Sequence, residues 1–129
     1  MLLLKRVVIH TKDRLLAQAI STSVESLLVG YEIKIARNSF ELFQRDSLSQ
    51  MQIFVLEVCS AGQYAYSQRM ADIKGLKRGK RDVKVIFYVD EDNDVLIDLV
   101  KQAKRTGVID GFVFGCATGC YLAAVIDSL

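Results

Sequence analysis

The chain has 129 residues, of which 51% are hydrophobic and 25% charged, and its 17 basic and 15 acidic side chains leave a net charge of +2. This length and balance predict one globular domain over residues 1–129 and exclude a general electrostatic attraction to nucleic acid, membranes or acidic substrates. The opening Met1–Arg6 is too short for a secretory core and no later run approaches a spanning helix, so we expect a cytoplasmic protein.

The first half of the chain alternates between strand and helix patterns. Arg6–Ile9 is typical of a short buried strand, and the apolar residues of Leu15–Leu28 recur with the 3.6-residue period of a helix. Tyr31–Ile35 alternates apolar with polar residues, which indicates an edge strand with one face in water. A capping-box-like pair of Asn and Glu then starts a helix predicted to run from Asn38 to Leu48.

The segment Gln52–Cys59 is an unbroken apolar run whose only charge is Glu57. Such a run predicts a strand buried on both faces of a sheet, with Glu57 close to its carboxyl end. In open α/β sheets, ligands bind outside the carboxyl ends of the strands. The surroundings of Glu57 therefore decide what this protein does.

A less regular helix follows, carried by Tyr66, Met70 and Ile73, and it leads into Lys74–Arg81, where five bases and two glycines predict a mobile surface connection. Val83–Val89 is the second strongly buried strand. Two strands that are apolar on both faces require helices packed against both faces of the sheet that they form.

The last part of the chain starts with the acids of Asp90–Asp94, at the point where the apolar face of Val95–Ala103 begins a helix. The positive end of that helix stabilises acidic side chains. Phe112–Phe114 predicts a last short strand, and Thr118 is a suitable cap for a final helix that extends to Leu129.

Five strands that alternate with five helices at short spacing predict a parallel sheet covered on both faces, because parallel neighbours need crossover connections. The most economical arrangement is a flavodoxin-like (βα)5 three-layer sandwich of the α/β class with strand order 2-1-3-4-5.

The order and spacing of these segments resemble the CheY-like receiver domain of bacterial response regulators over nearly the whole chain. The matching segments are Arg6–Asp13, Ile53–Val58, Val85–Val89, Thr106–Gly107 and Asp110–Phe114. Receivers transfer a phosphoryl group onto an aspartate that ends the third strand, with Mg²⁺ on an acidic pair after the first strand. A hydroxyl residue ends their fourth strand and a lysine ends the fifth.

This chain departs from the family at each of those positions. The acidic pair falls on Thr11 and Lys12, the acceptor on Glu57, the hydroxyl on Val89 and the lysine on Gly115. Mg²⁺ requires hard oxygen ligands, and a transferred phosphoryl group requires preorganised positive charge. We therefore expect a degenerate pseudo-receiver that is not phosphorylated, has no catalytic activity and uses no cofactor.

Two alternatives stay open for Glu57, which is one methylene longer than aspartate. It either pairs with Lys12 and holds the fold in one signalling arrangement, or it points into solvent at the end of its strand. An exposed ion pair would contribute little to stability.

The resemblance implies that the domain binds a protein partner in signal transduction or transcriptional regulation, with no role in binding nucleic acid or membranes. The candidate partner face is formed by the fourth helix, the fifth strand and the fifth helix. Its residues are Phe112, Lys101, Lys104, Arg105 and Tyr121. A homodimer through the last two helices is a second expectation, and a static core role for Phe112 is the alternative to partner binding.

A small redox protein or enzyme that uses Cys59 or Cys116 is the alternative from another class. Cys116 and Cys120 lie four residues apart at a predicted helix start, where the dipole lowers a thiol pKa. A redox pair has two intervening residues rather than three, so buried, inert thiols are favoured.

Three further groups have a structural and a functional interpretation. The acids of Asp90–Asp94 could bind a divalent cation with Glu57, although a solvated helix start is favoured. His10 is the single histidine and has no adjacent nucleophile, so a structural role is favoured. The bases of Lys74–Arg81 lack interleaved aromatic residues, which argues against nucleic-acid binding.

Overall fold

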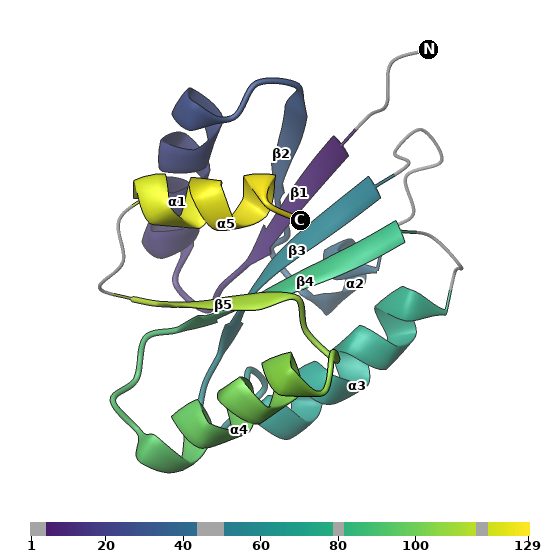
Figure 1. The fold of residues 1–129 in the computed structure, drawn as a ribbon, viewed down its shortest axis with the longest axis vertical. Coiled ribbons are helices and arrows are strands. Elements are labelled where there is room, and N and C mark those ends of the chain that lie inside the picture. The colour runs from purple at the N-terminus through teal and green to yellow at the C-terminus, as the bar shows by residue number, and fades with distance from the viewer. Residues whose placement is uncertain (1–4, 44–50, 79–81, 116–118) are drawn as a thin grey trace.

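A five-stranded parallel sheet is the central layer of the computed structural model, which describes residues 5–43, 51–78, 82–115 and 119–129 (Figure 1). The strands are β1 (Lys5–His10), β2 (Tyr31–Ile35), β3 (Met51–Val58), β4 (Asp82–Val89) and β5 (Gly111–Phe114). Their order is β2-β1-β3-β4-β5, and all pairs are parallel. The predicted flavodoxin-like order is therefore confirmed, with β2 at one edge.

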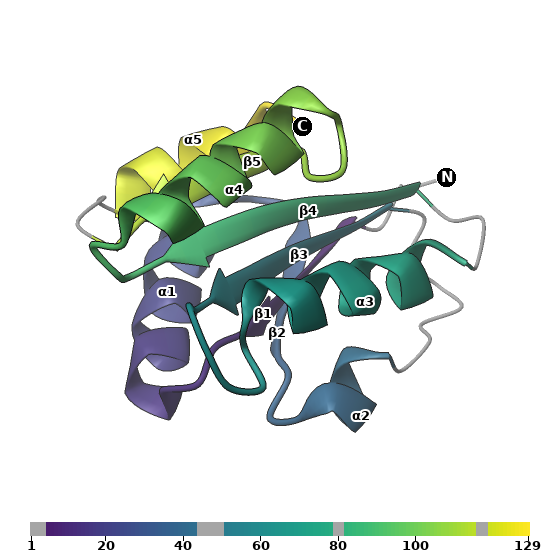
Figure 2. The same cartoon turned by 90° about the horizontal axis from the view of Figure 1, so that it is seen from below.

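Helices cover both faces of the sheet. They are α1 (Arg14–Leu27), α2 (Ser39–Leu42), α3 (Tyr66–Lys77), α4 (Asp94–Arg105) and α5 (Gly119–Asp127). Buried residues of α2, α3 and α4 share one apolar cluster with the sheet, whereas those of α1 and α5 share the other. Both views show α1 beside α5 and α2 beside α3 (Figures 1 and 2).

Strand β3 is buried on both faces, as its continuous apolar run predicts. Ile53 and Val55 pack against the cluster of α1 and α5, whereas Phe54 and Leu56 pack on the opposite side. All four side chains are at most 2% exposed. Since the central strands have no wet face, polar chemistry is confined to the strand ends.

The buried faces of two helices differ from the predicted ones. In α1, Leu15 is 80% exposed, and the buried residues include Ala17, Ile20 and Val24. Leu15 precedes Ala17 by two positions and so lies on nearly the opposite side of the helix. In α4, Val95 is likewise 72% exposed. An apolar residue in the first turn therefore does not reveal which way its helix faces.

The prediction that Lys74–Arg81 is a mobile connection is wrong in its first half, because α3 continues to Lys77. Gly75 lies inside this helix, where a Cβ atom would come within 2.7 Å of the Phe43 ring. The glycine therefore serves a close approach between α2 and α3 rather than a break. Lys74 and Lys77 occupy the last turn, where the helix dipole favours positive charge.

The capping-box-like start predicted for α2 is present, although the Glu41 side chain bonds to the residue before the N-cap Asn38. The Asn38 side chain accepts a hydrogen bond from the Glu41 N–H (2.9 Å), and the Glu41 carboxylate accepts one from the Arg37 N–H (3.0 Å). The predicted continuation to Leu48 lies outside the described residues, as do Thr118 and Cys116.

Candidate functional site

The carboxyl ends of β1, β3, β4 and β5 meet at one edge of the sheet and bring the five degenerate receiver positions to it. The parallel register pairs His10 with Leu56, Glu57 with Tyr88 and Val89 with Phe114. Thr11 and Lys12 therefore follow β1 next to Glu57, and Gly115 follows β5 next to Val89. The Gly115 N–H donates to the Val89 carbonyl (2.8 Å).

The Glu57 carboxylate is buried at this edge, with only 3% of the residue exposed. Its Oε1 accepts a hydrogen bond from the main-chain N–H of Lys12 at 2.8 Å. The expectation that Glu57 points into solvent is therefore wrong. The alternative contact with Lys12 is present, but it is made by the main-chain N–H of Lys12 and not by its side chain. Within the described residues no ion pair joins the Lys12 ammonium to Glu57.

The loops after β3 and β4 are joined above Glu57. The Ser60 N–H donates to both carboxylate oxygens of Glu91, at 3.1 and 3.3 Å. Hydrogen bonds from Ser60 lower the pKa of Glu91, and the Lys12 charge acts in the same direction. Glu91 therefore stays ionised and ties the loop after β4 to the loop after β3.

Positive charge at this mouth comes from Lys12. Burial raises the pKa of the neighbouring Cys59 thiol, and the Glu57 charge raises it further, whereas the Lys12 charge opposes both. The Lys12 charge therefore acts on Cys59 and Glu91, at the edge of the sheet where a receiver would hold its metal ion.

The Asp90 side chain occupies the space in which a side chain at position 115 would start. A Cβ atom added to Gly115 would overlap Asp90 Oδ1 and come within 3.3 Å of Asp90 Cα. A lysine, which the family places here, would fit only after the exposed Asp90 side chain turned away. Asp90 therefore stands where the family's cation would begin.

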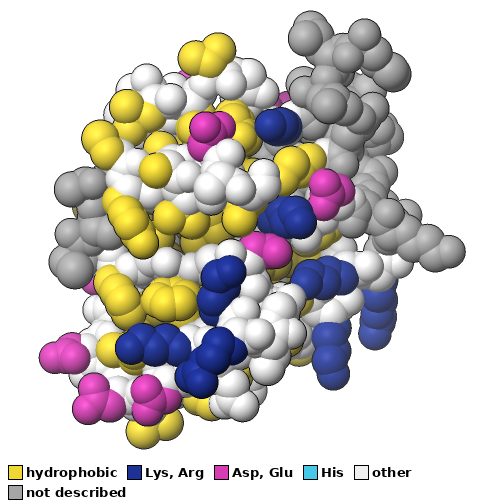
Figure 3. Space-filling view, in the orientation of Figure 1, with side chains coloured by type: hydrophobic (Ala, Val, Ile, Leu, Met, Phe, Trp, Pro, Cys, Tyr) yellow, Lys and Arg dark blue, Asp and Glu magenta, His cyan; other side chains and the backbone are white. Residues whose placement is uncertain are grey.

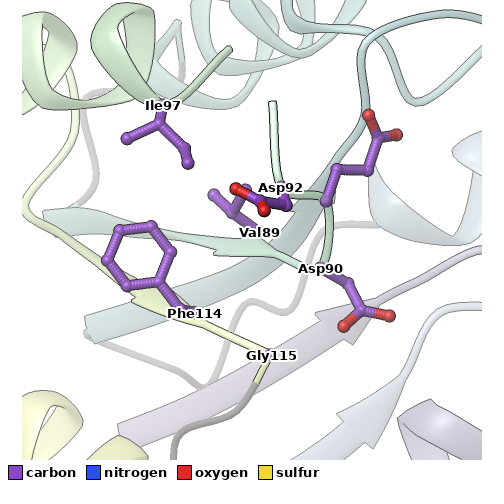
Figure 4. A pocket seen from close by; sticks show the side chains of 7 residues that line it. Val89, Asp90, Asp92, Ile97, Phe114 and Gly115 are labelled. Carbon is purple, nitrogen blue, oxygen red and sulfur yellow. The ribbon is translucent and has the colours of Figure 1, made fainter. Parts of the chain in front are cut away.

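Val89 and Gly115 line a pocket of roughly 340 Å³ that is separate from the contact between Glu57 and Lys12. Figure 4 shows its apolar walls, Val89, Ile97 and Phe114, together with Asp90 and Asp92. Val89 is 1% exposed and offers no hydroxyl where the family has one.

The residues at this edge do not fit Mg²⁺ bound in the manner of a receiver. Thr11 uses its hydroxyl to donate to the Asp13 carbonyl (2.7 Å), and the Asp13 carboxylate accepts from the Leu15 N–H (2.9 Å) as the cap of α1. Within ranges 5–43, 51–78, 82–115 and 119–129, no group of three or more His, Cys, Asp or Glu residues is arranged to hold a metal. We therefore derive no reaction step through a metal ion.

A buried arginine that sequence reasoning missed connects β1, β3 and α3. Arg69 is 1% exposed and donates to the main-chain carbonyls of Glu57 (2.7 Å) and His10 (3.0 Å). It also pairs with Asp72 at 3.3 Å and lies over the Tyr64 ring. The sequence did hold one sign of this burial. Arg69 lies on the same side of α3 as the apolar residues Tyr66, Met70 and Ile73.

His10 is part of the same cluster, as the predicted structural role requires. Its Nδ1 lies 2.9 Å from Arg69 Nη1, whereas its Nε2 is buried without a partner among the described atoms. Burial lowers the pKa of His10 to about 4, and the Arg69 charge adds to this, against the opposing charges of Asp72 and Glu41. The ring is therefore neutral at physiological pH, with Nδ1 accepting from the guanidinium.

The candidate partner-face residues lie on α4, β5 and α5 as predicted. Phe112 is half-buried, and Lys101, Lys104, Arg105 and Tyr121 are exposed. The Phe112 ring packs edge-on against Phe114, with 5.6 Å between centroids. A fully buried role for Phe112 is therefore not what the structure shows.

The thiols differ from the expectation that both members of the Cys116 and Cys120 pair are buried. Cys120 is exposed, Cys59 is buried, and Cys116 lies outside the described residues. The spacing alone did not reveal that Cys120 lies on the outer side of α5.

Comparison with solved structures extends these observations. The order 2-1-3-4-5 with helices on both faces defines the flavodoxin-like class, and no protein-family model or curated protein matches the sequence. A DNA-binding response regulator of the LuxR family from Staphylococcus aureus is 13% identical, with a TM-score of 0.69 over 95% of this chain and 96% of that one.

Two further structures show the same similarity. A CheY-like response regulator receiver domain from Methanospirillum hungatei is 16% identical, with a TM-score of 0.69 over 97% of this chain and 92% of that one. An adenylate cyclase structure from Rhodopirellula baltica is 12% identical, with a TM-score of 0.68 over 95% and 84%. The chain thus has the fold of CheY-like receiver domains, and the predicted resemblance is confirmed at the level of the fold.

Proposed function

We propose that residues 1–129 form one receiver-like domain that is not phosphorylated and acts as a non-enzymatic protein-interaction module in signal transduction or transcriptional regulation. The hydrogen bond from the Lys12 N–H to the carboxylate of the buried Glu57 carries this proposal. Through this bond, the carboxylate at the position of the family's phosphoryl acceptor already has a partner in the same chain.

The chemistry of phosphoryl transfer supports the proposal. Its transition state spreads negative charge over three oxygens, and catalysis depends on preorganised cations around them. Here Thr11 and the exposed Lys12 stand where the family places two carboxylates, and the Asp90 side chain lies against Gly115 where it places a lysine. An acidic Asp90 at that point repels an incoming phosphoryl group instead of stabilising it.

The test is incubation of the intact protein with acetyl phosphate and MgCl₂, followed by intact-mass measurement. We expect no gain of a phosphoryl group. Glu57→Gln is the matched control, because it keeps the shape of the side chain and removes the nucleophilic carboxylate. Uptake of one phosphoryl group by the native protein and not by Glu57→Gln would overturn the proposal.

The face formed by α4, β5 and α5 is the proposed contact surface for a protein partner or a second copy of the chain. Phe112 and the exposed Tyr121 supply aromatic surface, and Lys101, Lys104 and Arg105 supply a positive rim. Among the described residues, none of the helices is long and apolar enough to cross a membrane. Analytical ultracentrifugation of Tyr121→Ser against the native chain tests the homodimer, since a shared sedimentation coefficient at all concentrations would refute it.

A further inference from the structure

A second surface lies at the opposite end of the sheet from Glu57, where α3 ends and the link from α4 to β5 passes. Met70, Ile73 and Val108 line a groove there, and Lys74, Lys77 and Arg78 complete its lining. The groove has a volume of roughly 430 Å³. It combines an apolar floor with a positive rim.

Internal contacts hold this groove in shape. Lys77 Nζ donates to the Val108 carbonyl at 3.1 Å, which ties the link after α4 to the last turn of α3. Ile73 is 3% exposed and anchors the helix in the core. The groove is thus present in the free protein and does not have to form when a partner binds, which lowers the cost of binding.

The positive charge of the rim is not neutralised by neighbouring acids. In the part of the chain that the structure describes, Lys74, Lys77 and Arg78 form no ion pair. The nearby Asp110 carboxylate is engaged by the Val85 N–H at 2.8 Å. Because the whole chain carries a net charge of only +2, this cluster is a local concentration of charge.

Figure 3 shows dark blue side chains over the middle, right and lower left of the visible face, with magenta ones scattered among them and gathered at its lower left edge. Lys104 and Arg105, in the last turn of α4, belong to the face of α4, β5 and α5 and do not line this groove. The attraction for an acidic partner therefore comes from Lys74, Lys77 and Arg78.

The residues that line the groove favour a protein over a nucleic acid as the acidic partner. A helix C-terminus accounts for basic side chains, but not for the aliphatic floor between them. Single-stranded nucleic acids are bound through aromatic stacking platforms, and double-stranded ones through elements that enter a groove, whereas Met70, Ile73 and Val108 offer neither. Aliphatic floors with charged rims are typical of protein interfaces.

We propose that this basic groove binds an acidic segment of a partner protein, which inserts an apolar side chain between Ile73 and Val108 and places carboxylates against Lys74 and Lys77. The surface is distinct from the face of α4, β5 and α5. It does not depend on whether Glu57 is phosphorylated.

The experiment is selection of short random peptides displayed on phage against the full chain. We expect enriched peptides to carry several acids around an aliphatic or aromatic residue. A synthetic copy of an enriched peptide should lose affinity by about tenfold with Lys74→Glu and with increasing salt. Arg14→Glu, an equal charge change on exposed α1, is the matched control and should leave the affinity unchanged.

A second variant separates charge from packing. Val108→Ser removes apolar floor without changing the charge, and it should also weaken binding by about tenfold. Circular dichroism and urea unfolding establish that each variant is folded. Enriched peptides without acids, affinity unaffected by Lys74→Glu, or weakening by Arg14→Glu to the same extent would each overturn the proposal.

Two other ligands are outcomes of the same test. A DNA duplex, or vesicles that contain phosphatidylserine, would bind with the same sensitivity to Lys74→Glu if the groove recognised phosphate. Such binding, with no acidic peptide selected, would also overturn the proposal of a protein partner.

Discussion

The hydrogen bond from the Lys12 N–H to Glu57 makes a quantitative prediction about stability. A hydrogen bond to a charged acceptor contributes about 1.5–3 kcal/mol, and this one is partly buried. Glu57→Leu takes the acceptor away from the Lys12 N–H, so we expect the free energy of unfolding to fall by about 1.5–3 kcal/mol. Glu57→Gln keeps an oxygen acceptor at the same position and should cost only about 1 kcal/mol.

The Lys12 side chain provides the matched control for the same bond. Because the donor is main chain, Lys12→Ala keeps the hydrogen bond, and an exposed substitution of this kind should change stability by no more than about 0.5 kcal/mol. Urea unfolding of the four proteins at neutral pH measures the differences, provided that the slope with denaturant stays constant.

The result that would refute this reasoning is a different ranking of the variants. If Lys12→Ala and Glu57→Gln each lower the free energy of unfolding as much as Glu57→Leu does, the stabilising contact is an ion pair between Glu57 and the Lys12 ammonium, and not a main-chain hydrogen bond.

Four further predictions follow from the cluster around the site. The folded-state pKa of His10 (about 4) lies below its ordinary value of 6.5, so protons bind preferentially to the unfolded chain, and stability present above pH 6.5 falls toward pH 4 by at most about 1.4 kcal/mol per pH unit; NMR titration of this single imidazole and the flatter profile of His10→Gln check it. Arg69→Met leaves a buried carboxylate unpaired and should cost about 3–5 kcal/mol in urea unfolding, and a cost below about 1 kcal/mol would contradict the buried cluster. Gly115→Ala should destabilise by no more than about 1 kcal/mol, because the exposed Asp90 side chain has to turn away, and Asp90→Gly should restore most of that loss in a double-mutant cycle, whereas additive effects would show that the two sites do not touch. With the other two cysteines replaced by serine, Cys59 should react slowly with a thiol reagent until urea is added, and rapid labelling of the folded protein would favour the redox alternative.

The architecture was predictable because the signals for it are redundant. The runs of β3 and β4 are apolar on both faces, which only a parallel sheet covered by helices accommodates. The alternating pattern of Tyr31–Ile35 placed β2 at an edge. Short connections and right-handed crossovers then left few orders other than 2-1-3-4-5.

The site was predictable in position but not in its contacts. The sequence places Glu57 at a strand end, yet the choice between solvent and Lys12 depends on where a main-chain N–H lies, which no side-chain pattern encodes. The burial of Arg69 was missed for a related reason. An arginine on a helix is usually exposed, and only the two carbonyls at the ends of β1 and β3 make its burial favourable.

The contacts around Glu57 join the ends of three strands without any ligand. Lys12 holds its carboxylate, Arg69 holds its carbonyl and that of His10, and Glu91 holds the loop at Ser60. A ligand shifts a conformational equilibrium only by its difference in affinity between the two states. A metal ion or a phosphodonor would change the occupancy of these intramolecular bonds only by binding another arrangement more tightly. On the proposed function neither reacts at this edge, so a partner meets one constant surface, and control of signalling passes to the abundance of the two proteins and to the partner's own affinity.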